Sequence, residues 1–164
     1  MLIEKEIKLS ILHKTPLNFI KNHPACDAKI LIDGELIDAE FVIDTGADIT
    51  VLPLSYVYEL DIDSRTVAKD YDCGGIGNGK LIGRIITADS LIVANYSVRT
   101  PYIFIPDDEN WSIPILGFDM LRGVYPFIDT KDGCVWFTRI KDAGVTKIPS
   151  IGLELRCDVL LKEL

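Results

Sequence analysis

The chain has 164 residues, about the length of one ordinary domain, so a second full hydrophobic core is not expected. Hydrophobic residues make up 48% and charged residues 26%, which excludes a disordered or low-complexity chain. Seventeen Lys and Arg against 25 Asp and Glu give a net charge of −8, which disfavours a nucleic acid or an anionic membrane surface as a partner.

Compartment and cofactor use follow from a few further features. No apolar run approaches the roughly 18 residues that span a bilayer, and charges interrupt the apolar residues at the start, unlike a secretory signal. We therefore expect a cytoplasmic protein without membrane contact. The four cysteines form no C-x-x-C pair and are expected to be reduced. With two histidines, His13 and His23, there is little material for a metal site, so neither a metal nor an organic cofactor is predicted.

Most of the chain is typical of short β-strands separated by turns. Alternation of Ile7, Leu9 and Ile11 with polar neighbours predicts an N-terminal strand. Both residues of the Asp33-Gly34 dipeptide tolerate positive φ, which predicts a tight hairpin between strands at 28–32 and 35–43. Further β-rich runs lie, in chain order, at 49–52, 81–87, 91–94, 102–105, 127–129 and 134–138.

Helical signals are few. Ser55 could cap a short helix through Leu60, after Pro53, and residues 117–122 could form another. Many short strands with regular turns predict an all-β closed or partly open barrel rather than a βαβ sheet.

One segment brings a carboxylate into a tight turn between two apolar strands. The first strand ends at Asp44, and the second begins at Ile49. Thr45 can fix the turn through its hydroxyl group, and Gly46 leaves room for a backbone or a substrate to approach. An ordinary turn with Asp44 as its Asx residue is the alternative, but the apolar strands on both sides favour a functional site.

Three motifs carry a family resemblance. Asp44-Thr45-Gly46-Ala47-Asp48 resembles the catalytic signature of the retropepsin-like aspartic proteases, and the glycine-rich residues 73–79 resemble the flap hairpin of that family. Residues 113–121 resemble its apolar-apolar-Gly segment and the helix that follows. Residues 127–131 are similar to the cellular branch, which includes the DNA-damage-inducible proteases.

The resemblance covers about residues 28–140 and implies a protease domain there. Residues 1–27 would then be an N-terminal strand or extension, and residues 141–164 a C-terminal extension that could join a dimer interface. The implied fold is all-β: a single-lobe retropepsin-like barrel with one or two short helices, closed by dimerisation.

The implied function is that of a homodimeric aspartic endopeptidase. Each chain holds one D-T-G triplet, so Asp44 of each subunit would meet at the two-fold axis, share one proton and activate a water. The substrate would be an extended polypeptide held by β-augmentation. The family implies that Asp44, Thr45 and Gly46 are catalytic residues and that the substrate is bound by Ala47, Asp48, Gly75, Ile76 and Gly77.

One departure and one alternative bear on this interpretation. Retroviral members usually carry Arg directly after the Gly of the third motif, whereas this chain has Phe118, so the viral ion-pair network around Asp48 is not carried over. The alternative function is a catalytically silent retropepsin-like module for dimerisation or peptide binding, in which one of the two terminal segments occupies the groove.

Overall fold

The structure is a computed structural model that describes residues 9–74, 80–122 and 124–140. Short β-strands dominate these residues, as expected for an all-β protein. The strands are β1 (Leu9–Pro16), β2 (Asn18–Ile20), β3 (His23–Ile32), β4 (Glu35–Ile43), β5 (Thr66–Gly74), β6 (Lys80–Thr87), β7 (Ser90–Val93), β8 (Tyr96–Arg99), β9 (Tyr102–Pro106), β10 (Ile115–Leu116), β11 (Tyr125–Asp129) and β12 (Cys134–Ile140). The helical elements are the single-turn 3-10 helices η1 (Leu54–Tyr56) and η2 (Asp63–Arg65) and the short α1 (Phe118–Leu121).

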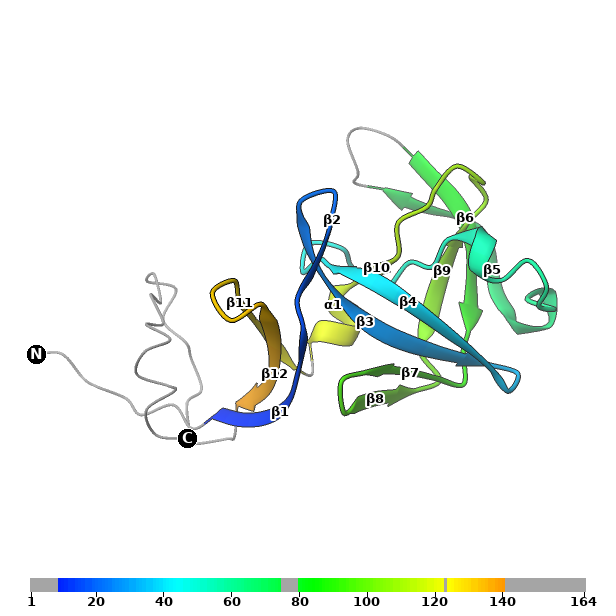
Figure 1. The fold of residues 1–164 in the computed structure, drawn as a ribbon. Helices are drawn as coiled ribbons and strands as arrows, with labels where there is room; N and C mark the ends of the chain where they lie inside the picture. Colours follow the sequence, from blue (N-terminus) through cyan, green and yellow to red (C-terminus); the bar gives the residue numbers. More distant parts are fainter. Residues whose placement is uncertain (1–8, 75–79, 123, 141–164) are drawn as a thin grey trace, which may run out of the picture.

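These strands form three groups of neighbours (Figure 1). The central group has the order β10-β4-β3-β7-β8, with β2 beside β3, and all of its pairs are antiparallel except the parallel pair of β10 with β4. The second group, β5-β6-β9, lies at one end of the central group, and the third, β1-β12-β11, lies at the opposite side. The site described below lies at the end of β4, beside β10, and packs on the same hydrophobic cluster as the β5–β6 hairpin.

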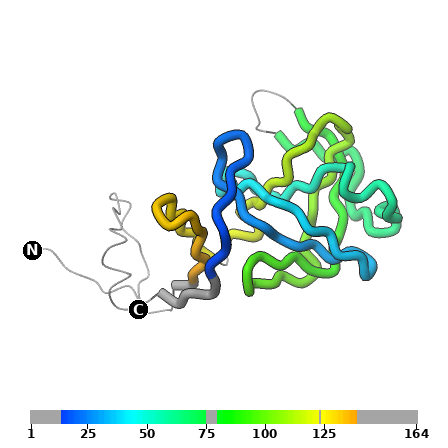
Figure 2. Tube along the Cα trace, in the orientation of Figure 1, coloured from blue at the N-terminus to red at the C-terminus, as the bar shows by residue number. Residues whose placement is uncertain are grey.

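The first and last described strands lie side by side although they are far apart in the sequence (Figure 2). β1 runs antiparallel to β12, with Leu9 opposite Ile140 and Pro16 opposite Cys134. β1 and β2 fall within residues 1–27, the segment predicted as an N-terminal strand or extension. Ile7 and residues 141–164 lie outside the described residues.

Two hydrophobic clusters fill the interior. The main cluster lies around β3 and β4 and includes the fully buried Phe41 and Phe137. The smaller second cluster consists of the buried Val51, Phe104 and Ile115, with partly buried residues of the β5–β6 hairpin packed against it. Because burying such a side chain contributes about 1.5–3 kcal/mol, these clusters hold the three groups of strands together.

The predicted hairpin and most predicted strands are confirmed. Asp33 has a φ of 51° and Gly34 a φ of 83°, so both central residues of the β3–β4 turn adopt the left-handed conformation that a two-residue hairpin needs. The prediction of a short helix at 117–122 agrees with α1.

Two local predictions are wrong. Ser55 does not begin a helix that reaches Leu60: a single 3-10 turn begins at Leu54, directly after Pro53, and the next turn is closed by the N–H of Leu60 bonded to the carbonyl of Val57. Residues 49–52 form no regular strand, because Val51 makes only isolated bridges, to β9 on one side and to β10 on the other.

Candidate active site

Asp44 occupies a tight turn immediately after β4. Its backbone N–H donates to the carbonyl of Leu116 at 3.1 Å, and the N–H of Ala47 donates to the carbonyl of Asp44 at 3.3 Å. The side chain takes part as well, since Oδ1 of Asp44 accepts the N–H of Gly46 at 2.8 Å. An ordinary Asx turn makes the same bond, so this bond fixes the orientation of the carboxylate without assigning it a role.

The chain that leaves the turn is held between two strands. The backbone of Val51 exchanges two hydrogen bonds of 2.9 Å with Ile115 of β10. On its other side, the N–H of Phe104 in β9 donates to the carbonyl of Thr50 at 2.9 Å, and the N–H of Leu52 donates back to Phe104 at 3.0 Å. Backbone bonds therefore fix both arms of the turn, meaning the chain that enters it and the chain that leaves it. The residues at the tip of the turn, Thr45 and Gly46, are exposed.

The start of α1 packs directly on the turn. The N–H of Phe118 donates to the carbonyl of Ala47 at 2.7 Å. A Cβ atom on Gly117 would lie 2.5 Å from the carbonyl carbon of Ile49 and 2.6 Å from its oxygen, closer than such contacts occur. Only glycine therefore allows this approach, which explains the Gly of the third motif.

The predicted site residues on the turn differ in exposure. Asp44 and Ala47 are half-buried, whereas Thr45, Gly46 and Asp48 are exposed in the single chain. The structure thus brings together the five turn residues that were predicted as site residues. Gly75, Ile76 and Gly77 lie outside the described residues.

The strands of the predicted flap hairpin are present. β5 and β6 pair antiparallel up to Gly74 opposite Lys80, on either side of residues 75–79. Cys73 of β5 packs against the second hydrophobic cluster, together with Ala47 of the turn. Burial raises the pKa of the Cys73 thiol, and the charges of Asp48 and Asp72 raise it further. This hairpin and the turn therefore face one hydrophobic cluster from two sides.

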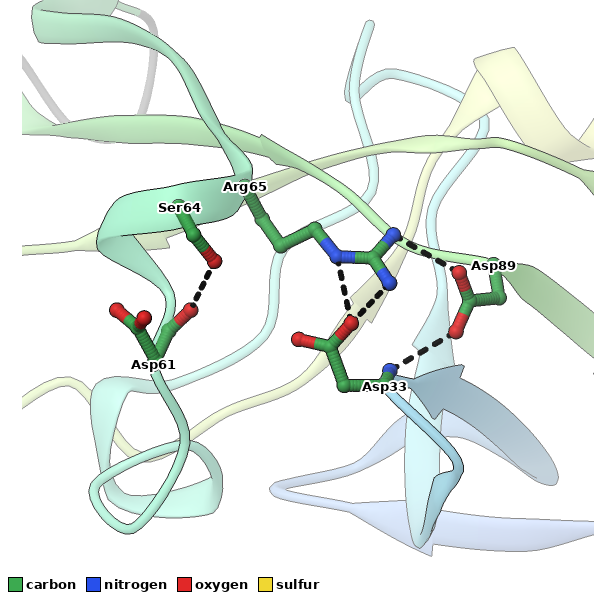
Figure 3. A network of polar contacts seen from close by, with 5 residues as sticks. All are labelled: Asp33, Asp61, Ser64, Arg65 and Asp89. Carbon is green, nitrogen blue, oxygen red and sulfur yellow. Dashed lines mark hydrogen bonds and ion pairs between the residues drawn. The ribbon is translucent and has the colours of Figure 1, made fainter.

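Ion pairs attach the hairpin at its base (Figure 3). Arg65, the residue before β5, forms ion pairs with Asp33 in the β3–β4 turn and with Asp89, its Nη1 lying 2.8 Å from Oδ1 of Asp89. Asp89 also accepts the N–H of Asp33 at 2.8 Å. On β6, Arg84 pairs with Asp63 at 2.8 Å. Sequence reasoning missed this network because its members come from separate turns.

A second missed contact lies beneath the turn. The hydroxyl of the fully buried Thr50 donates to Oδ1 of Asp119 at 2.8 Å and accepts the N–H of Gly117 at 3.1 Å. Burial raises the pKa of Asp119 above its ordinary value of 3.8, against the opposing effect of the hydrogen bonds from Thr50 and Met120. In the sequence, Thr50 is the one polar residue of an apolar run, which indicates that its hydroxyl is buried. The sequence does not indicate which residue the hydroxyl bonds to.

Phe118 replaces the viral Arg and has half of its surface exposed beside the turn. Within the described part of the chain, no ion pair involves Asp48. Among the same residues, no group of three His, Cys, Asp or Glu side chains is arranged to hold a metal. None of the helices in the described ranges is both long and apolar enough to cross a membrane.

Comparison with known proteins identifies the family. Residues 28–123 match the family model described as "gag-polyprotein putative aspartyl protease". This match spans more than half of the chain, and the chain therefore belongs to this aspartic protease family. No curated protein matches it.

Solved structures agree on the fold. A retropepsin-like aspartic protease from Rickettsia conorii superposes with a TM-score of 0.54 at 16% identity, covering 84% of this chain and 97% of that chain. The EIAV protease complexed with the inhibitor HBY-793 has a TM-score of 0.44 at 23% identity, covering 61% of this chain and 86% of that chain. The retroviral protease-like domain of Ddi1 from Leishmania major has a TM-score of 0.37 at 19% identity, covering 70% of this chain and 92% of that chain. At these identities the likeness, carried by the Rickettsia structure, shows a retropepsin-like fold and no more.

Proposed function

We propose that this chain is a homodimeric aspartic endopeptidase in which Asp44 of each subunit supplies one carboxyl group. The observation that carries this proposal is the turn itself. The carboxylate of Asp44 is held by the N–H of Gly46 at the end of β4, in a turn fixed on both arms. Family membership supports a catalytic role for this carboxylate, because the family is one of aspartic proteases.

The chemistry needs two such carboxyl groups. Two carboxylates close together cannot both ionise, so one keeps a proton while the other acts as a base. The base takes a proton from a water, which attacks the peptide carbonyl, and the protonated partner donates a hydrogen bond to the carbonyl oxygen. A single chain supplies one D-T-G triplet, so the second carboxyl group comes from a second copy.

The remaining predicted residues take supporting roles in this proposal. Thr45, exposed in the single chain, would bond across the dimer axis, while Gly46, Ala47 and Asp48 would contact the substrate backbone. The β5–β6 hairpin would cover an extended peptide, with Gly75, Ile76 and Gly77 at its tip and the N–H of Ile76 as the donor. Covering the peptide would exclude water and align the scissile bond.

The test combines cleavage and sedimentation of the full chain. Asp44→Asn should abolish cleavage of an unfolded polypeptide, because the shared proton is lost, and should leave the dimer intact. Asp38→Asn, which removes an exposed carboxyl group on β4, is the matched control and should cleave normally. A statine-type inhibitor should block cleavage by the wild type.

The alternative is a silent module for dimerisation or peptide binding. It predicts a dimer that neither cleaves nor binds the inhibitor at any pH. A stable monomer, or cleavage that persists in Asp44→Asn, would rule out the proposed mechanism. A dimer in which the two Asp44 carboxyl groups lie far apart would rule it out as well.

A further inference from the structure

A second carboxyl group, that of Asp119 on α1, lies beneath the catalytic turn and has no part in the proposed proton sharing. Its Oδ1 accepts two hydrogen bonds, from the Thr50 hydroxyl at 2.8 Å and from the N–H of Met120 at 2.9 Å. The second bond is local to α1. The first joins residues 69 positions apart, and it links α1 to the chain that leaves the turn.

The direction of the hydrogen bond between Thr50 and Asp119 is set by a third group. A hydroxyl has one proton to donate and lone pairs to accept with. Since the N–H of Gly117 donates to the Thr50 hydroxyl at 3.1 Å, the hydroxyl proton points to a different acceptor, which is Asp119. Thr50 is fully buried, so no bulk water replaces this acceptor if it is removed.

Gly117 transmits this contact to the turn. Its two neighbours in the chain make the backbone bonds that hold the turn: Leu116 accepts the N–H of Asp44, and Phe118 donates to Ala47. Any shift of Gly117 therefore moves both attachments. Gly117 also lies so close to the backbone of Ile49 that a Cβ atom would not fit between them.

We propose that Asp119 is a positioning residue, which fixes Gly117 through the Thr50 hydroxyl and thereby holds the turn that carries Asp44. The catalytic consequence rests on the proposed function, whereas the hydrogen-bonded chain from Asp119 to Gly117 does not. A carboxylate suits this place because it accepts and never donates, so it cannot compete with Gly117 for the hydroxyl.

Several groups around Asp119 shift its pKa. Burial raises its pKa, and the hydrogen bonds from Thr50 and Met120 and the nearby charge of Arg122 lower it. The turn packed against α1 carries Asp44 and Asp48. Protonation of Asp119 weakens the bond from Thr50, because a charge-assisted hydrogen bond becomes a neutral one, and the change reaches the Gly117 N–H.

The kinetic test separates hydrogen bonding from charge and from packing. Asp119→Leu keeps the branched shape of the side chain, although it is larger, and removes the acceptor. It should lower kcat on the order of 10- to 100-fold with little change in KM, as misplacement of a catalytic group does. Asp119→Asn keeps an acceptor and should retain most of kcat. Thr50→Val should resemble Asp119→Leu, the double variant should lose no more than either one, and Thr50→Ser should restore the rate.

Asp38→Asn is the control for the loss of an exposed carboxyl group. Wild-type kcat in folded Asp119→Leu would overturn the proposal. So would an equal loss in Asp119→Asn and Asp119→Leu, since charge rather than hydrogen bonding would then be responsible.

A second measurement does not need activity. The amide resonance of Gly117, followed by ¹H–¹⁵N NMR in the full chain, should shift with pH and follow the raised pKa of Asp119 in the wild type. The titration should disappear in Asp119→Asn and persist in Asp38→Asn. If the wild type cleaves nothing, the proposed function fails, and this titration still decides the positioning role. A Gly117 amide that does not respond to pH, or titrates equally in Asp119→Asn, overturns it.

Discussion

The turn of Asp44 and the root of the β5–β6 hairpin pack on the same hydrophobic cluster but differ in the polar side-chain contacts that support them. The turn is held by backbone bonds of 2.7–3.1 Å, donated by Asp44 to the Leu116 carbonyl and by Phe118 to the Ala47 carbonyl, and the buried Thr50 hydroxyl reinforces it. The hairpin root is held by the backbone pairing of β6 with β9 and, at the surface, by the ion pairs of Arg65 (Figure 3) and Arg84.

The difference indicates what each region has to do. Breaking a buried hydrogen bond leaves an unsatisfied group at a cost of about 1–3 kcal/mol, so the turn stays in one geometry. Ion pairs near the surface are worth little and are screened by salt, so those of Arg65 and Arg84 add only a small part to the hold on the hairpin root. Under the proposed function, the turn has to keep its carboxylate in one place while the hairpin admits a peptide.

The largest effect is expected where the two regions share a residue. Phe104 is fully buried in the second cluster, and its backbone bonds to Thr50 and Leu52 in the segment that leaves the turn. Phe104→Ala should lower the free energy of unfolding by about 3–5 kcal/mol, because a large cavity opens beneath both regions. Urea denaturation at a fixed protein concentration measures this loss. Phe19→Ala, on a side chain 58% exposed, should change stability little, and a similar loss in both variants would contradict the assignment of the core.

The next effect should fall on the turn alone. Gly117→Ala places a methyl group 2.5 Å from the backbone of Ile49, so the turn or α1 has to move, at about 1–3 kcal/mol. Activity should fall with stability. Gly74→Ala is the matched control for stability, since a Cβ there meets nothing within 4 Å. Equal stability of the two variants in urea would show that the close approach at Gly117 does not restrict the turn.

A smaller, pH-dependent effect is expected at Asp119. Burial raises its pKa in the folded state above the ordinary value of 3.8, so the folded state holds this proton more tightly than the unfolded state. Its contribution to stability is therefore complete below pH 3.8 and is lost as pH rises through the raised folded pKa. The free energy of unfolding of the wild type minus that of Asp119→Asn should decline over this window in a denaturation series. A flat or rising difference would contradict the burial of this carboxyl group.

How much the sequence could predict depended on whether the determining signal was local. The Asp33-Gly34 turn was predictable because two adjacent residues specify it through their own φ angles. β8 was missed because its residues alternate only between half-buried and exposed and show little contrast. β5 was missed because charged residues and two register shifts disturb its alternation, with Asp70 at a φ of 52°. The helix expected from Ser55 gave way to a single 3-10 turn, because propensity is a weak guide over one turn.

In the candidate site as well, the residues with a local signal could be predicted and the others could not. Asp44 and its neighbours form one contiguous motif, so their place in a turn between apolar strands followed from the sequence. The bond from Thr50 to Asp119 could not, because 69 positions separate the two residues and only the fold brings them together. The ion pairs of Arg65 are equally non-local, with Asp33 lying 32 positions away. Residues that hold a site are thus harder to predict from a sequence than residues that form it.

The smallest effect is expected at the hairpin root. Arg65→Gln removes the cation between Asp33 and Asp89, which are then left as neighbouring like charges, so the thermal midpoint should fall slightly at low salt. The loss should shrink at high salt, because screening weakens both the lost attraction and the new repulsion. Cleavage should respond through KM more than through kcat, since the variant loosens the β5–β6 hairpin and leaves the turn of Asp44 untouched.

Lys29→Gln, which breaks an exposed pair with Asp38 elsewhere on the surface, is the matched control and should leave KM unchanged. A fall in kcat at constant KM in Arg65→Gln would mean that the root and the turn are coupled, and the separate roles assigned to the two regions would be wrong.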